Sequence, residues 1–169
     1  MENYALSIAN YFVLLSQRDD VILRQLKLMK LVYIAHGYML ALLDRPTEGA
    51  KLEKVEAWRY GPVFPSVYNS FKDYGSNPIV LMAVVDDPSN VENGRYRKTI
   101  PMIEDESEKV VCEFVWQKYA IYTDSTLISA LHAEGTPWSE VYRAGENAII
   151  SDEITKRYYK QIIDDTLKS

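Results

Sequence analysis

Residues 26–43 read LKLMKLVYIAHGYMLALL, and the rest of the chain is organised around this stretch. Only Lys27, Lys30, His36 and Gly37 interrupt its apolar residues, which fall on every side of a helical wheel. A helix that is apolar all round lies in a membrane or at the centre of a helical core. The two lysines and the histidine leave apolar runs of about five or six residues, whereas roughly 20 are needed to cross a bilayer. We therefore predict that residues 26–43 form a buried central helix.

The composition is that of one folded domain spanning residues 1–169. Of the 169 residues, 47% are hydrophobic and 12% are aromatic, which argues against disorder. The length is sufficient to close one core, and the chain has no internal repeat, low-complexity segment or linker. The 13 tyrosines suit packing at the edge of a core and equally suit a recognition surface, so composition leaves both uses open.

Charge and cysteine content restrict the partner and the compartment. The chain has 19 Lys and Arg against 24 Asp and Glu, so its net charge of −5 disfavours direct nucleic-acid binding. Cys112 is the single cysteine, which excludes an internal disulfide and suits a reducing cytoplasm. The first 20 residues have no basic segment before their apolar part, unlike a signal peptide. We expect a cytoplasmic protein without membrane contact.

Apolar residues recur with the helical period in six further segments. These segments are residues 4–17, 65–74, 107–122, 124–134, 137–144 and 152–163. The residues that signal a helix start are Pro65, Ser107, Thr123 or Asp124, the pair Thr136-Pro137, and Ser151. Gly75 is a predicted C-terminal cap, and Asp44-Arg45-Pro46 should stop the central helix.

A small amount of β structure interrupts these helices. Residues 55–59 alternate weakly and predict a short strand, which the Gly61-Pro62 pair should break. Residues 79–85 and 95–103 predict two strands of a hairpin, with its turn at Asn93-Gly94. The predicted fold class is mainly α (α+β): about seven helices around a buried central helix, with a small antiparallel β element.

The residue types needed for catalysis do not occur in a catalytic arrangement. His36, His132 and Cys112 have none of the spacings of a metal site, and Cys112 lies in a segment typical of an inert buried thiol. No nucleophile elbow or phosphate-binding glycine loop occurs, and the paired acids fall in turns or on exposed faces. We therefore predict no enzyme activity, no metal and no cofactor.

One cluster, residues 57–68, combines aromatic residues with an arginine, a glycine and two prolines. It reads AWRYGPVFPSVY. Prolines and glycine restrict the backbone, so the aromatic groups are presented at little entropic cost. Trp, Tyr and Arg are also the residue types that dominate the energetics of protein interfaces. The sequence leaves two interpretations open, namely a recognition surface and a rigid corner between a strand and a helix.

A second cluster, residues 131–138, reads LHAEGTPW. Its Gly135-Thr136-Pro137 sequence is typical of a tight turn between helices, with Trp138 as a core anchor. The alternative is that this cluster contributes to a recognition surface.

The polar groups of the central helix form a third set. Its members are Lys27, Lys30, Tyr33 and His36. The simplest interpretation is structural, in which the lysines pair with Glu56 or Asp73. The alternative is a small-ligand site, because two lysines three residues apart could hold an anion.

Taken together, these segments resemble the Panacea-domain, or SocA-like, antitoxins, which also occur as phage-associated proteins. The matching segments, in the order of the family, are residues 26–37, 56–68, 71–75 and 131–138. Departures are Met29, where a glutamine is expected, and Leu131-His132, where a Thr-His pair is common. Residues 83–103 match no part of the family pattern.

The resemblance implies a non-catalytic antitoxin that neutralises a co-encoded toxin by direct protein–protein binding. Some relatives look like adaptors that deliver the toxin to a cytoplasmic protease. The candidate protein-binding residues are Trp58, Arg59, Tyr60, Pro62, Phe64, Pro65, Tyr68 and Trp138. The net charge of −5 would favour a basic toxin by electrostatic complementarity. The alternatives are a small-ligand-binding or nucleic-acid-binding regulator without catalysis.

Overall fold

The computed structural model describes residues 3–44 and 53–169. Within these ranges the helices are α1 (Tyr4–Arg18), α2 (Gln25–Leu42), α3 (Pro65–Phe71), the 3-10 helix η1 (Lys72–Tyr74), α4 (Glu106–Tyr119), α5 (Asp124–His132), α6 (Pro137–Val141) and α7 (Asp152–Lys168). The strands are β1 (Val55–Trp58), β2 (Gly61–Val63), β3 (Val85–Glu92), β4 (Arg95–Thr99) and β5 (Ala148–Ile150). The protein is therefore mainly helical with small antiparallel sheets, as predicted.

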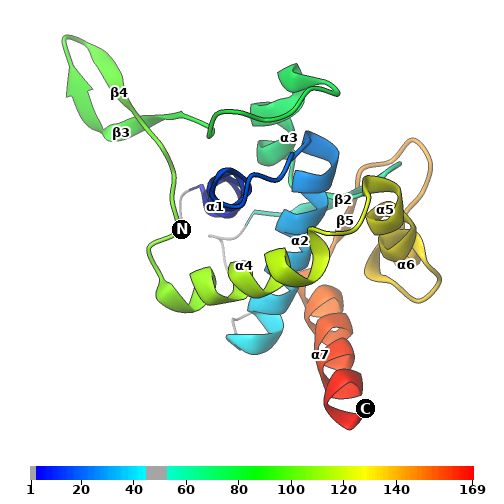
Figure 1. Cartoon of the computed structure of the whole chain (residues 1–169). Helices are drawn as coiled ribbons and strands as arrows, with labels where there is room; N and C mark the ends of the chain where they lie inside the picture. The colour runs from blue at the N-terminus through cyan, green and yellow to red at the C-terminus, as the bar shows by residue number, and fades with distance from the viewer. Residues whose placement is uncertain (1–2, 45–52) are drawn as a thin grey trace.

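Helix α2 is buried along nearly its whole length. Every residue from Leu28 to Leu40 is buried, and α2 packs against α1, α3, α4, α5, α7 and β2. In Figure 1 the other helices lie around α2 on several sides. Apolar residues on all sides of the helix allow this packing, because each side meets a different neighbour. Helix α2 ends at Leu42, shortly before the predicted stop at Asp44-Arg45-Pro46, of which Arg45 and Pro46 lie outside the described residues.

Most of the predicted helix starts are confirmed, with one exception. Thr123, Thr136 and Ser151 each accept a backbone N–H in the first turn of α5, α6 and α7, and Pro65 occupies the first turn of α3. The prediction of Ser107 as the cap of α4 is wrong. The carboxylate of Asp105 accepts the N–H of Glu108 at 3.1 Å, and aspartate caps as well as serine does.

The first sheet has the strand order β2-β1-β5, and all its pairings are antiparallel. The prediction that Gly61-Pro62 breaks the strand is wrong, because the chain reverses at Arg59 and Tyr60 and returns as β2. Pro62 fits into β2 because this strand lies at the sheet edge, where a missing N–H costs no ladder bond. Strand β5 is too short and too distant in sequence to have been predicted.

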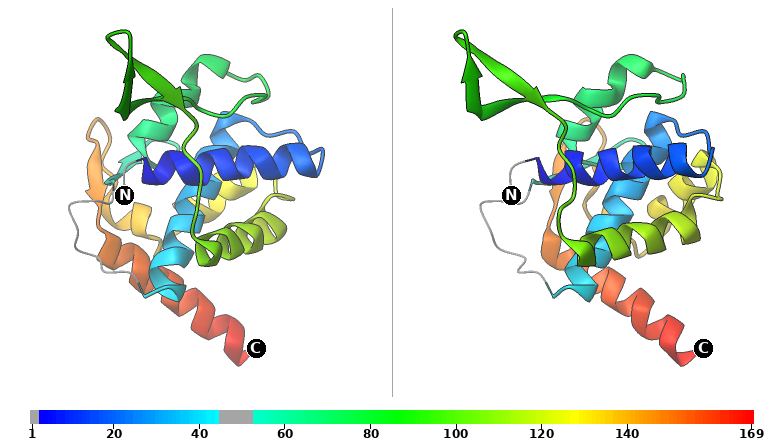
Figure 2. Two further views of the ribbon diagram at one scale, coloured as in Figure 1. Left: turned by 90° about the vertical axis from the view of Figure 1, so that its left-hand side faces the viewer. Right: turned by 60° about the vertical axis from the view of Figure 1, so that its left-hand side comes forward.

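The second sheet is the hairpin β3–β4, which extends away from the helical body (Figures 1 and 2). The predicted turn at Asn93-Gly94 is confirmed, but the predicted strand at residues 79–85 is wrong. Residues 79–84 run as irregular chain, with Ile79 N–H bonded to Leu23 O at 2.8 Å. The side-chain amide of Asn10 bonds both backbone groups of Ala83 and the carbonyl of Pro101. Both ends of the hairpin are therefore attached to α1 by one residue.

Candidate functional site

The turn between β1 and β2 places two candidate residues at the surface. Arg59 and Tyr60 form this turn, and Tyr60 is 56% exposed. The Arg59 guanidinium carbon lies 5.4 Å from the centre of the Tyr60 ring. Gly61, which follows, has φ of 116°, a backbone conformation that favours glycine. The turn therefore presents the side chains of Arg59 and Tyr60 at the surface, and Gly61 permits the backbone conformation that follows them.

The two clusters that the sequence singled out meet behind this turn. The Nε1–H of Trp138 donates to the carbonyl oxygen of Trp58 at 2.7 Å. Trp138 also stacks between His132, at a centroid distance of 3.8 Å, and Tyr142, at 4.4 Å. The Trp58 ring meets Tyr68 edge to face at 4.9 Å. Residues 57–68 and 131–138 thus form one aromatic surface, which we call the corner.

Not all candidate residues of the corner are accessible. Phe64 is 1% exposed and packs against the rings of Tyr4 and His36, and Pro62 is also buried. Trp58, Tyr68, Pro65 and Trp138 are half-buried. Arg59 and Tyr60 are thus the exposed members of the predicted set, whereas Pro62 and Phe64 belong to the interior of the protein.

A groove of about 540 Å³ lies between the corner and the beginning of α2. Trp58, Tyr60 and Tyr68 line it from the corner, and Leu26 and Met29 line it from α2. Its charged lining residues are Arg24, Arg59 and Asp124, and Lys30 also lines it. The contribution of α2 to this groove was not predicted from the sequence. Its signal was the three-residue spacing of Leu26 and Met29, which also occurs in any packed helix.

Lys30 lies at the floor of this groove. Its side chain is 0% exposed, and its Nζ donates to Pro62 O at 3.2 Å. Burial lowers the pKa of Lys30 to about 7. Lys27 likewise bonds a carbonyl, Ala120 O at 3.0 Å. The pairing of these lysines with Glu56 or Asp73 suggested by the sequence is therefore wrong, because both ammonium groups meet backbone carbonyls.

The two other polar residues of α2 connect helices. His36 Nε2 lies 2.8 Å from a carboxylate oxygen of Asp152, and its Nδ1 lies 2.9 Å from the Tyr4 hydroxyl. The Tyr33 hydroxyl pairs with that of Thr155 at 3.1 Å. Burial raises the pKa of Tyr33, so its hydroxyl stays protonated at neutral pH. These bonds link α2 to α1 and to α7, which is a structural arrangement.

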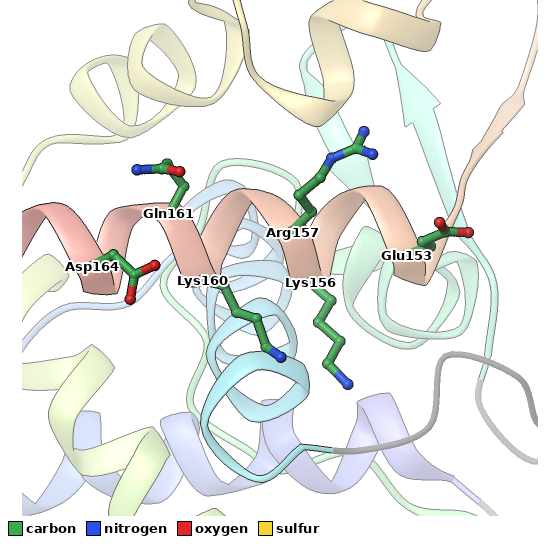
Figure 3. Close-up of a pocket in the computed structure, with 6 residues that line it drawn as sticks. All are labelled: Glu153, Lys156, Arg157, Lys160, Gln161 and Asp164. Carbon is green, nitrogen blue, oxygen red and sulfur yellow. The ribbon is translucent and has the colours of Figure 1, made fainter.

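A second depression, of about 410 Å³, runs along α7 and is drawn in Figure 3. All six of its lining residues belong to that helix, so a single element forms it. Lys156 and Lys160 extend from one side of α7 and pair with Asp44 at 2.9 and 3.7 Å, whereas Arg157 extends from the opposite side (Figure 3). These side chains point in different directions, so the depression does not offer a ligand a set of convergent groups.

The part of the chain that the structure describes has neither a metal-binding cluster nor an exposed thiol. No group of three or more His, Cys, Asp or Glu residues there could hold a metal ion. Cys112 is buried, and burial raises the pKa of its thiol, which keeps the thiolate from forming. No helix in residues 3–44 and 53–169 is both long enough and apolar enough to cross a membrane.

Comparison with known proteins identifies the family. The family described as "Antitoxin SocA-like, Panacea domain" matches residues 28–139, which is more than half of the chain. The chain belongs to the SocA-like Panacea-domain antitoxin family. Among curated proteins, Antitoxin SocA of Caulobacter vibrioides (strain NA1000 / CB15N) is 29% identical over 137 residues, covering 81% of this chain and 69% of the relative. No solved structure matches. The Panacea-domain match includes the corner and most of α2.

Proposed function

We propose that this protein is an antitoxin that neutralises a co-encoded toxin by binding it directly, with the corner as the central contact. The observation that carries the proposal is the relationship to Antitoxin SocA over 81% of the chain. The absence of a recognisable reaction centre among the described residues is compatible with a binding protein but is not the basis of the proposal.

The geometry of the corner supports its role as the contact. Arg59 and Tyr60 lie at the tip of a two-stranded turn whose Trp58 carbonyl is bonded to Trp138. A surface that is already ordered loses little conformational entropy when it binds. Arginine, tyrosine and tryptophan are also the residues that most often carry interface energy. We therefore assign the largest contribution to Arg59 and Tyr60, with the edges of Trp58, Tyr68 and Trp138 around them.

The experiment co-expresses this chain with the protein encoded by the neighbouring reading frame. The intact chain is expected to relieve growth arrest caused by that protein and to co-purify with it. The double variant Arg59→Ala/Tyr60→Ala should lose both properties while remaining folded, because both side chains are exposed.

The chain contains a closely matched control. Arg95 and Tyr96 are also an exposed Arg-Tyr pair in a hairpin, and Tyr96 is 55% exposed against 56% for Tyr60. The variant Arg95→Ala/Tyr96→Ala should therefore rescue growth as the intact chain does. Equal loss of rescue by both variants would remove the corner from the proposal. No rescue by the intact chain would overturn the antitoxin function itself.

Measuring the half-life of the toxin separates neutralisation by binding from delivery to a protease. For simple neutralisation, the half-life of the toxin is unchanged or longer when the antitoxin is present. For an adaptor, the antitoxin shortens that half-life, and the effect disappears in cells that lack the cytoplasmic protease.

A further inference from the structure

The groove beside the corner has a local charge opposite to that of the whole protein. The chain carries a net charge of −5, whereas Arg24 and Arg59 line the groove against a single acid, Asp124, and Lys30, with a pKa of about 7, adds a partial positive charge at neutral pH. Between these charges the lining is apolar or aromatic, from Leu26, Met29 and Trp58 among others. A concave apolar surface with a few convergent polar groups is the usual form of a specific binding site.

The cations of the groove are not neutralised by the protein. Arg24 donates its Nε–H to the carbonyl of Ser76 at 3.1 Å, and Arg59 lies over the Tyr60 ring. Lys30 donates to Pro62 O. Among the residues that the structure describes, none of these three cations has an ion-paired carboxylate. Arg24 and Arg59 are exposed and therefore accessible to a carboxylate from outside, whereas Lys30 is buried, where a nearby carboxylate would favour its protonated form.

The groove also contains a buried hydrogen-bond acceptor, the Oε1 atom of Gln25. Gln25, which also lines the groove, donates its Nε2–H to Gly75 O at 3.3 Å, and this bond fixes the orientation of the amide. Its Oε1 atom is buried and has no partner within the described part of the chain. A buried acceptor without a donor is costly, and the backbone N–H of a polypeptide segment is a donor of the kind that this atom lacks.

We propose that the groove binds a segment of the partner protein in which an apolar or aromatic side chain stands next to a carboxylate. The apolar side chain enters the groove between Met29 and Trp58, and the carboxylate meets Arg24 and Arg59. This inference deepens the proposed function, on which it rests for the identity of the partner as a toxin. It differs from simple charge attraction, because an acidic protein here presents a basic site.

The first test needs no toxin, and it uses three small probes on the intact protein. N-acetyl-L-phenylalanine has the ring, the N–H and the carboxylate. N-acetyl-L-phenylalaninamide lacks the charge, and N-acetylglycine lacks the ring. Binding is followed by the NMR signals of the Met29 methyl group and the Trp58 indole. We expect the first probe to bind with a Kd on the order of 1 mM, and each of the other two at least about fivefold more weakly.

Charge variants then test the residues. Arg24→Gln and Arg59→Gln should each weaken binding of the first probe and leave that of its amide unchanged. Arg95→Gln, in the hairpin that extends away from the body (Figure 1), should change neither. Asp124→Asn removes the one acid of the lining and should strengthen binding of the carboxylate probe. A purely structural role for these residues would not produce this gain.

Two results would overturn the inference. One is equal binding of N-acetyl-L-phenylalanine and its amide. The other is the absence of any shift in the Met29 and Trp58 signals at about 20 mM probe, a concentration at which a site with the expected Kd would be largely occupied.

Results that overturn the groove as a binding site can be told apart from results that overturn the proposed antitoxin function. A toxin that binds the intact chain and the two arginine variants equally would leave the antitoxin function standing and remove the groove. Probe binding without any effect on the toxin would leave the groove as a small-carboxylate site and remove its protein partner.

Discussion

Lys30 shows how one buried amine can affect the stability of the whole fold. The pKa of Lys30 is lowered from 10.5 to about 7 by burial, and its Nζ has only a neutral carbonyl as its bonded partner in the described structure. The folded state therefore binds this proton much more weakly than the unfolded state does. Between about pH 7 and pH 10 the unfolded state holds the proton and the folded state does not, so stability rises with pH in that window.

The variant Lys30→Met tests this linkage. Methionine is unbranched, similar in length and does not titrate, so it should be at least as stable as the intact protein at pH 7. The stability of the intact protein relative to this variant should rise by about 1.4 kcal/mol per pH unit between pH 7.5 and 9. Denaturant unfolding at several pH values measures this difference, and the shared titration of the tyrosines cancels in it. A difference that does not depend on pH would contradict the lowered pKa.

Gly37 sets the distance between α2 and α7. A Cβ built at this position would lie 2.1 Å from a ring carbon of Tyr159, a fully enclosed residue. Gly37→Ala should therefore destabilise the protein by about 2 kcal/mol or more, despite the better helix propensity of alanine. Denaturant unfolding measures the loss.

A double-mutant cycle provides the control for this prediction. Tyr159→Leu alone should destabilise, because it removes a buried ring, but it also removes the atoms that the alanine would strike. The two substitutions should therefore be strongly non-additive, with the alanine costing little in the leucine background. Additive effects would show that the ring contact does not explain the need for glycine.

Among the elements, the hairpin β3–β4 depends most on a single attachment. Its strand residues are exposed or half-buried, and an isolated two-stranded hairpin is marginally stable in water. Asn10 is buried in α1 and makes three hydrogen bonds to the chain on either side of the hairpin. This side chain therefore joins the hairpin to the helical body, together with the core residues Ala83 and Ile103 on either side of it.

Asn10→Ala should destabilise the protein by about 2–4 kcal/mol, because it leaves backbone groups of Ala83 and Pro101 buried without partners. Amide hydrogen exchange at Ala83 should accelerate more than exchange within α2. Gln17→Ala is the control on the same helix, since Gln17 also bonds this segment, at Val80 O, but is exposed. It should cost less than about 1 kcal/mol. Equal costs would contradict the anchoring role of Asn10.

At the scale of the whole molecule, the net charge of the protein should affect its association rate with the toxin. With a net charge of −5, the protein should attract a basic toxin before contact. Raising the salt concentration from about 50 to 500 mM should then slow association about tenfold and change dissociation much less. Stopped-flow or surface-based kinetics of the complex would measure both rates. An association rate that is independent of salt would remove this electrostatic contribution.

The sequence by itself determined the fold class, the family and most of the helix starts. These depend on local signals, which act within a few residues of one another. The signals are apolar residues at the helical period, capping hydroxyls, and prolines in the first turns of helices. The segment at residues 26–43 could be predicted to be buried because apolar residues occupy all its sides. The turn at Asn93-Gly94 was likewise local.

Only the tertiary structure decided the site. Trp58 and Trp138 are 80 residues apart, and their hydrogen bond forms only because the fold brings the start of α6 next to the end of β1. The carbonyl partners of Lys27 and Lys30 come from distant elements, so the sequence suggested carboxylates in their place. The groove exists because α2 and the turn at Arg59 and Tyr60 lie against each other. Such contacts depend on the path of the whole chain, and no local pattern of residues specifies that path.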